Sequence, residues 1–240
     1  MKQNLLLLLL ALPFLSYAQK NITHQQQFWL RYYLKVPINS HWQLRQELDN
    51  RNYVFPGRKF QFLARTHIQR NLGNGWNIGL GFAYSEVAIP LDPAIKTYSI
   101  VRELRPSFEL AHLSNLSDKW NLHQRFWSEL RYFKQFPNIY TFSNIRFRYK
   151  LETHYSISSK FNVIAFDEIF INVGKKIINN TFDHNRLGLG LQFSLLKNLD
   201  LELTYINWFQ ELQSGSEYFK RDIVRLAFNH VIPIAHKTNQ

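Results

Sequence analysis

The residues of this chain that could do chemistry are mainly arginines and glutamates, and they recur at every second position. In "NIRFRYKLETHY", residues 144–155, Arg146, Arg148 and Glu152 alternate with apolar or aromatic residues. Side chains alternate between the two faces of a β-strand, so this stretch is predicted to be a strand with one charged and one apolar face. Arginine suits dense, bidentate ion pairs with carboxylates in confined sites. We therefore expect a network of ion pairs formed by Arg125, Glu129, Arg131, Arg146, Arg148, Glu152, Glu168 and Arg186.

Histidine and serine could instead support nucleophilic catalysis, in which a base takes the proton of a hydroxyl. The candidates are His112, His123, His154 and His184, with Ser114, Ser128 and Ser143. None lies in a Gly-x-Ser-x-Gly elbow, and alternation puts His123 and Ser128 on opposite faces of one strand. The glutamates could serve acid–base catalysis or bind a hard metal ion, but their interleaving with arginine favours structural ion pairs. We therefore expect no catalytic residue, no metal site and no cofactor.

The charged residues lie in a repeated unit that is predicted to be a β-hairpin. Five segments start with a short polar turn and then alternate, and their first apolar residues are Trp42, Trp76, Trp120, Phe161 and Leu199. Another alternating run precedes each turn, as in a hairpin. Connections rich in Pro, Asn, Gly and Lys join the hairpins at the other end; they are residues 52–59, 87–99, 133–142, 174–185 and 210–221. Short turns at one end and longer loops at the other are typical of bacterial outer-membrane barrels.

The apolar face of each run is predicted to contact lipid, and the charged face to line the barrel interior. Lys, Arg and Glu are missing from the apolar ladders, one of which contains Phe60 and Phe62. Asp167 is the one acid on these faces, and a β-bulge beside it would remove the exception. An Arg or Lys that faced lipid at the midplane would cost about 2–4 kcal/mol. The alternative is a soluble lipocalin-like or sandwich protein, whose strands also alternate.

Small residues on the charged face have a packing explanation. The glycines of "GLGLQF" and Gly79 and Gly81 occupy alternate positions on that side. This spacing is not a phosphate-binding loop; it leaves room for large side chains on neighbouring strands.

The number of runs does not fit an even-stranded barrel. Eleven alternating runs begin at residues 27, 42, 59, 76, 101, 120, 143, 161, 184, 199 and 223. Bacterial single-chain barrels have even numbers of strands, so we expect ten, with one run outside the barrel, or twelve, with a hidden closing strand. Residues 19–26 must then start at the outer rim or thread the lumen. The chain is predicted to form one domain, residues 19–240, of antiparallel all-β architecture with about 10–12 strands.

Composition and the N-terminus indicate an exported protein. The chain has 240 residues, no cysteine and a formal net charge of +12. Its opening has a basic start, an apolar stretch and small residues before Ala18, so we expect a signal peptide, residues 1–18, to be cleaved. Without cysteine there is no disulfide, lipid attachment or thiolate zinc site. Export, and arginines dispersed along strands, argue against nucleic-acid binding. The expected partners are outer-membrane lipid and the barrel assembly machinery, with the protein a monomer.

Several motifs, in order, resemble domain-of-unknown-function family 2490. They are "WNLHQRFWSELRYF", "NIRFRYKLETHYSI", "FDEIFINV", "FDHNRLGLGLQFSL" and "LDLELTYINWFQ". The polar positions that match the family pattern are Arg125, Glu129, Arg131, Arg146, Arg148, Glu168, Asn185 and Arg186. The resemblance implies an exported, barrel-like protein without an assigned activity. The chain departs from many outer-membrane barrels because it ends on "FNHVIPIAHKTNQ" and lacks a terminal aromatic residue. Either Phe228 serves internally as the assembly signal, or recognition by the assembly machinery differs.

Three functions are consistent with these features. The first is a small, filled barrel with a structural or assembly role in the Gram-negative envelope, which we expect. The second is a narrow channel biased toward anions by inward-facing arginine. The third is an outer-membrane lipid hydrolase or acyltransferase, the one enzymatic alternative. Connections of about a dozen residues offer little surface for large ligands, which disfavours a receptor for them.

Overall fold

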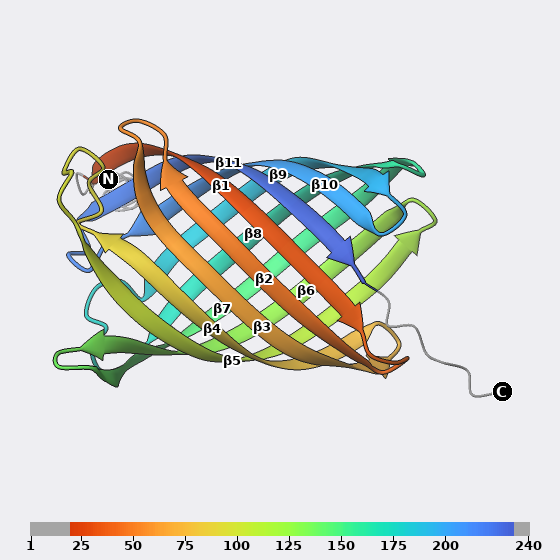
Figure 1. Cartoon of the computed structure of the whole chain (residues 1–240), viewed down its shortest axis with the longest axis horizontal. Helices are drawn as coiled ribbons and strands as arrows, with labels where there is room; N and C mark the ends of the chain where they lie inside the picture. Colours follow the sequence, from red (N-terminus) through yellow and green to blue (C-terminus); the bar gives the residue numbers. More distant parts are fainter. Residues whose placement is uncertain (1–19, 233–240) are drawn as a thin grey trace, which may run out of the picture.

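Eleven strands follow one another along the chain and close into a barrel (Figure 1). The computed structural model describes residues 20–232, so the predicted signal peptide, residues 1–18, lies outside them. The strands are β1 (Asn21–Pro37), β2 (Trp42–Tyr53), β3 (Arg58–Gly73), β4 (Trp76–Ile89), β5 (Ser99–Ser117), β6 (Trp120–Gln135), β7 (Ile139–Ser158), β8 (Phe161–Val173), β9 (Phe182–Leu196), β10 (Leu199–Glu211) and β11 (Glu217–Val231). No helix within residues 20–232 is long and apolar enough to cross a membrane.

The barrel has an odd number of strands, so the first and last strands run in the same direction where they close it. Every other neighbouring pair is antiparallel, but β1 pairs with β11 in parallel from Asn21↔Glu217 to Lys35↔Val231. The prediction of one all-β barrel of about 10–12 strands is confirmed, and all eleven alternating runs belong to the sheet. The expectation from even-stranded barrels, that one run lies outside the barrel or that a twelfth strand is hidden, was wrong. Residues 19–26 were expected to start at the outer rim or to thread the lumen; residues 21–26 form the start of β1 in the barrel wall and do not thread the lumen.

The two ends of the barrel differ in their connections. The turn end, at the right of Figure 1, contains residues 38–41, 74–75, 118–119, 159–160 and 197–198. The loop end, at the left, contains residues 54–57, 90–98, 136–138, 174–181 and 212–216. Asn74 and Gly75 both have positive φ, 48° and 80°, as a tight two-residue hairpin turn requires. The loops are shorter than predicted because the strands extend further toward the loop end.

The predicted inside and outside of the barrel are largely as the structure has them. Along β7, Arg146 and Arg148 are buried in the lumen while Tyr149 and Leu151 are exposed on the outer face. One assignment was wrong. A β-bulge where β3 pairs with β2 turns Phe60 inward, where it is 4% exposed. No bulge occurs at Asp167, which stays on the outer face and accepts a hydrogen bond from Asn185.

Candidate functional site in the barrel lumen

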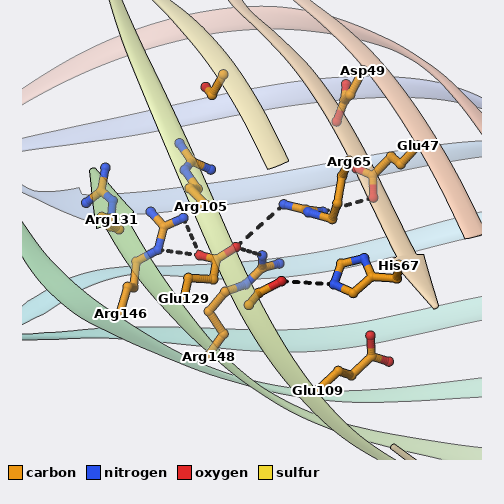
Figure 2. A network of polar contacts seen from close by, with 12 residues as sticks. Glu47, Asp49, Arg65, His67, Arg105, Glu109, Glu129, Arg131, Arg146 and Arg148 are labelled. Atoms are coloured by element: carbon orange, nitrogen blue, oxygen red, sulfur yellow. Dashed lines mark hydrogen bonds and ion pairs between the residues drawn. The ribbon is translucent and has the colours of Figure 1, made fainter. Parts of the chain in front are cut away.

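Glu129 on β6 is the centre of a polar network that fills the middle of the lumen (Figure 2). Its carboxylate accepts hydrogen bonds from Arg146 Nε at 2.9 Å and Nη2 at 2.6 Å, and from Arg148 Nη1 at 3.0 Å. Arg65 Nη2, from β3, lies 3.7 Å away. Glu129 is 0% exposed, and a carboxylate removed from water is stable only when charged donors surround it in this way.

Glu168 on β8 is the second bridging carboxylate. It accepts hydrogen bonds from Arg148 Nη2 at 2.7 Å and from Arg125 Nη2 at 2.9 Å. Arg148 therefore lies between Glu129 and Glu168 and joins the two groups. Glu129 and Glu168 are both among the eight residues of the ion-pair network that the sequence predicted.

Two of the predicted arginines, one on β6 and one on β7, also contact acids outside the predicted set. Arg131 Nε donates to Glu103 on β5 at 2.5 Å, and Arg146 Nη1 donates to Asp183 on β9 at 3.2 Å. Asp183 was missed because it lies within residues 174–185, which were assigned to a connection, where no alternation marks it. Glu103 alternates with Arg105 within a predicted run, so its inward position had a signal in the sequence.

Two of the predicted network residues differ from the others. Glu152 contacts Lys150 and His154, with His154 Nε2 at 2.9 Å, and has no arginine partner among the described residues. Arg186 lies in the lumen but forms no ion pair within residues 20–232, and its Nε–H has no acceptor there. Six of the eight predicted residues thus lie in arginine–carboxylate pairs, and these two do not.

Several contacts cross the lumen between strands that are not neighbours. Arg65 on β3 approaches Glu129 on β6, and Arg45 on β2 pairs with Glu109 on β5. His67 Nε2 lies 3.1 Å from Ser107 Oγ, a contact that joins β3 to β5. Because these side chains reach across the barrel, they occupy most of the middle of the lumen.

Aromatic side chains fill the lumen on the loop side of this network. Trp29 on β1 and Phe60 on β3 pack against Trp208 on β10, with ring centroids 5.8 and 6.0 Å from that of Trp208. Tyr53 on β2 packs on Phe60 at 5.2 Å. These rings are buried with Ile206 and Ile223. The sequence did not single them out, because inward aromatic residues interrupt an otherwise polar face without a spacing of their own.

The connection between β4 and β5 is tied to the barrel wall beside the aromatic cluster. Arg58 donates to the carbonyl oxygens of Pro90 at 2.5 Å, Asp92 at 2.8 Å and Ile95 at 2.6 Å. Tyr53 Oη donates to the Leu91 carbonyl at 2.9 Å. Leu91 packs against the aromatic cluster, so this loop covers the interior at the loop end.

The opposite half of the lumen is hollow and polar. A cavity of about 420 Å³ at the turn end, called here the turn-end vestibule, is bordered by exposed strand-end residues such as Lys35, Leu113 and Val231. Deeper in, its walls carry His123, Glu152, His154 and Asp200 among other polar residues. The interior is thus closed at the loop end and in the middle, and hollow at the turn end.

The histidines and serines considered for catalysis do not form a triad. His112 Nδ1 lies 3.1 Å from Ser114 Oγ, but no carboxylate within residues 20–232 contacts His112. His123 stacks on His154, with centroids 4.7 Å apart, and His184 Nδ1 lies 3.2 Å from Asp183 Oδ2. In the described part of the chain, His, Asp and Glu form no cluster of three or more that is arranged to hold a metal ion.

Comparisons with known proteins agree with this fold. The model of a family described as "Protein of unknown function (DUF2490)" matches residues 26–219. No curated protein matches the chain significantly. Among solved structures, the chain is similar to the NanC porin in a rhombohedral crystal form, with a TM-score of 0.54 and 10% sequence identity. The alignment covers 86% of this chain and 98% of the porin chain. At this identity the likeness shows a shared barrel fold.

Proposed function

The chain belongs to the DUF2490 family of proteins of unknown function, as its ordered motifs predicted, and from this premise we propose that it is an integral outer-membrane protein of the Gram-negative envelope with a structural or assembly role. The observation that carries this proposal is the division of the barrel into an apolar outer face and a charged, closed interior. The predicted signal peptide and the porin-like fold support the same location.

The outer face supports contact with lipid. Leu80, Leu187, Leu189 and Leu203 are each at least half exposed on it, and a large contiguous apolar surface marks contact with a membrane or a partner. Charged side chains face outward near the loop end. There the Glu86 carboxylate forms ion pairs with Lys59 Nζ at 3.0 Å and with Arg102 Nε at 3.3 Å. Ion-paired charges are tolerated near a membrane interface, where their cost falls to about 0–1 kcal/mol.

Fractionation tests the location. We expect the protein to stay in the outer-membrane fraction after carbonate or urea washing, and to migrate differently on SDS gels before and after boiling, as a closed barrel does. Recovery as a soluble periplasmic monomer would contradict the proposal. The monomeric state and dependence on the barrel assembly machinery belong to the same proposal, with Phe228 near the end of β11 as the candidate recognition residue.

The filled lumen supports a barrel that does not conduct. Purified protein in a planar bilayer should show little or no steady conductance, because the Glu129 network and the aromatic cluster leave no open path. Large, steady, cation-selective currents would contradict both the filled lumen and its positive charge.

A narrow, anion-biased channel is the second candidate, and the surplus of inward arginine favours it. If currents appear, they should select anions, and Arg146→Gln combined with Arg148→Gln should weaken that selectivity. A lipid-modifying enzyme is the third and least supported class, because His112 and Ser114 lack an acidic partner among the described residues. We propose that the protein has no enzymatic activity.

A further inference from the structure

The middle of the lumen contains a small cavity whose walls are mostly cationic. Its volume is about 60 Å³, and its lining contains nine arginines, one lysine and two glutamates, Glu47 and Glu168. About 10–15 Å³ of such volume holds one water molecule, so the cavity, called here the central cavity, has room for a small polyatomic ion. Carboxylates behind the lining offset many of these charges, but not all.

Several guanidinium groups in the lining have an N–H donor that lacks an acceptor in the described part of the chain. Arg65, Arg105 and Arg225 are only 6%, 5% and 6% exposed, and the Nε–H of each has no acceptor among the described residues. The Nε–H groups of Arg31 and Arg186 are unpartnered in the same way. A buried donor without an acceptor is unfavourable, and five such donors line one cavity.

Arg186 carries a positive charge that forms no ion pair with a carboxylate among the described residues, although Glu168 is its register partner on β8. Its guanidinium carbon lies 4.3 Å from the ring centroid of Trp208, 4.7 Å from that of Phe170 and 5.2 Å from that of Trp29. Aromatic faces attract a cation and hold the guanidinium in place, yet they accept none of its in-plane N–H bonds. The rings thus hold the guanidinium of Arg186 in position, but within residues 20–232 it does not form an ion pair with an anion, which would be its strongest interaction.

The central cavity is reached from one side. Arg31, Arg125 and Arg225 line both the central cavity and the turn-end vestibule, so the two are adjacent. The aromatic cluster and residues 90–98 close the opposite side. A solute would therefore enter from the turn end.

We propose that the central cavity is a binding site for a small oxoanion, such as phosphate, sulfate or a terminal phosphate or carboxylate group. Oxoanions accept the paired, planar N–H donors that guanidinium presents, and a bound anion would compensate buried charge that is otherwise unpaired. This inference goes beyond the proposed function, because it holds whether or not the lumen conducts.

The first experiment measures thermal unfolding of the purified protein in detergent with inorganic sulfate, at an ionic strength matched with chloride. We expect a saturable rise of the unfolding midpoint with sulfate and a weaker effect of chloride, because a ligand stabilises the folded state to which it binds. The binding of glycerol 3-phosphate is then compared with the binding of inorganic phosphate. This comparison shows whether the anion is part of a larger molecule or a free ion. Tighter binding of the ester means that the vestibule accepts a larger molecule, whereas tighter binding of phosphate means a free ion, and both support the site. No saturable response to any of these anions would overturn the proposal.

The second experiment compares variants. Arg186→Gln should raise the midpoint in chloride, since a partly buried cation without an ion-pair partner among the described residues is removed, and should weaken sulfate binding by about tenfold or more. Arg102→Gln, the same change on the outer face, should leave the sulfate dissociation constant unaltered. Glu168→Gln removes a carboxylate from the lining and should tighten binding, which keeps the test open if Arg186→Gln does not fold. Wild-type sulfate binding in Arg186→Gln, or weaker binding in Glu168→Gln, would overturn the proposal.

Discussion

At the scale of single residues, the interior depends on carboxylates that are shared among several arginines. Glu129 contacts three of them, and Arg148 connects it to Glu168. Breaking a buried ion pair by removing one partner typically costs about 3–5 kcal/mol, because the other charge stays buried. In the proposed membrane location the outer face has the opposite requirement, since a single charge there would meet lipid.

Substitutions at two neighbouring residues of β7, one facing outward and one facing inward, test these two requirements separately. Phe147→Arg places a cation on the outer face, where it should cost about 2–4 kcal/mol near the midplane and block or weaken membrane assembly. Arg148→Leu should permit insertion but lower thermal stability, because Glu129 and Glu168 each lose a donor. Assembly is measured by heat-dependent gel migration of membrane fractions. Exchanged phenotypes would mean that the inside and outside have been assigned the wrong way round.

The lumen-facing glycines give a second prediction at this scale. A Cβ at Gly188 would lie 2.3 Å from the Phe166 ring, which is itself buried. Gly188→Ala should therefore destabilise the barrel by about 1–3 kcal/mol through overpacking. Gly57→Ala is the matched control, since its nearest neighbour would be the Val54 carbonyl oxygen at 3.7 Å. The midpoints of thermal unfolding in detergent compare the two, and equal midpoints would contradict the packing role of Gly188.

At the scale of elements, the connection at residues 90–98 differs from the other connections. It is bound by side chains of three strands, through Gln25, Tyr53 and Arg58. Its hydrogen bonds use backbone carbonyl groups, so its own sequence gives little sign of them.

Releasing this connection should loosen the loop end. Arg58→Ser removes three hydrogen bonds to carbonyl oxygens of residues 90–95, so we expect faster proteolytic cleavage within residues 90–98. Lys59→Ser is the control, because Lys59 contacts Glu86 on the outer face and does not hold the loop. Limited proteolysis of the purified protein measures the difference. Equal cleavage rates in the two variants would mean that Arg58 does not retain the loop.

At the scale of the whole molecule, the parallel contact between β1 and β11 decides the closure. Hairpins alone add strands in antiparallel order, so an odd total leaves the first and last strands running in the same direction. The registered pairs along this contact extend over almost the whole of β1. This closure also puts the start of β1 at the loop end and the end of β11 at the turn end.

The closure can be tested with engineered cysteines, because the natural chain has none. Leu30 and Leu226 are register partners across β1 and β11, and neighbouring strands lie about 4.7–4.9 Å apart. Leu30→Cys combined with Leu226→Cys should cross-link under oxidation or with a short thiol reagent, which a gel shift detects. Leu30→Cys with Leu187→Cys, on β9, should not cross-link. Absence of a link between positions 30 and 226 would contradict the eleven-stranded closure.

The sequence by itself determined the strands and their two faces. Five strand starts at the turn end, residues 42, 76, 120, 161 and 199, agree with the structure, because tight turns have strong local signals. At the loop end the strands were predicted too short. There the residues that extend each hairpin are polar or irregular, so apolar alternation disappears before the backbone pairing does.

Only the tertiary structure decided the strand count, the partners inside the lumen and the closed loop end. Closure depends on pairing between residues about two hundred positions apart, and no local pattern encodes whether that pair is parallel. Alternation shows that Arg186 faces inward, but not that it meets aromatic rings instead of a carboxylate. Which charges meet across a barrel depends on its strand number and register, and these are properties of the assembled sheet.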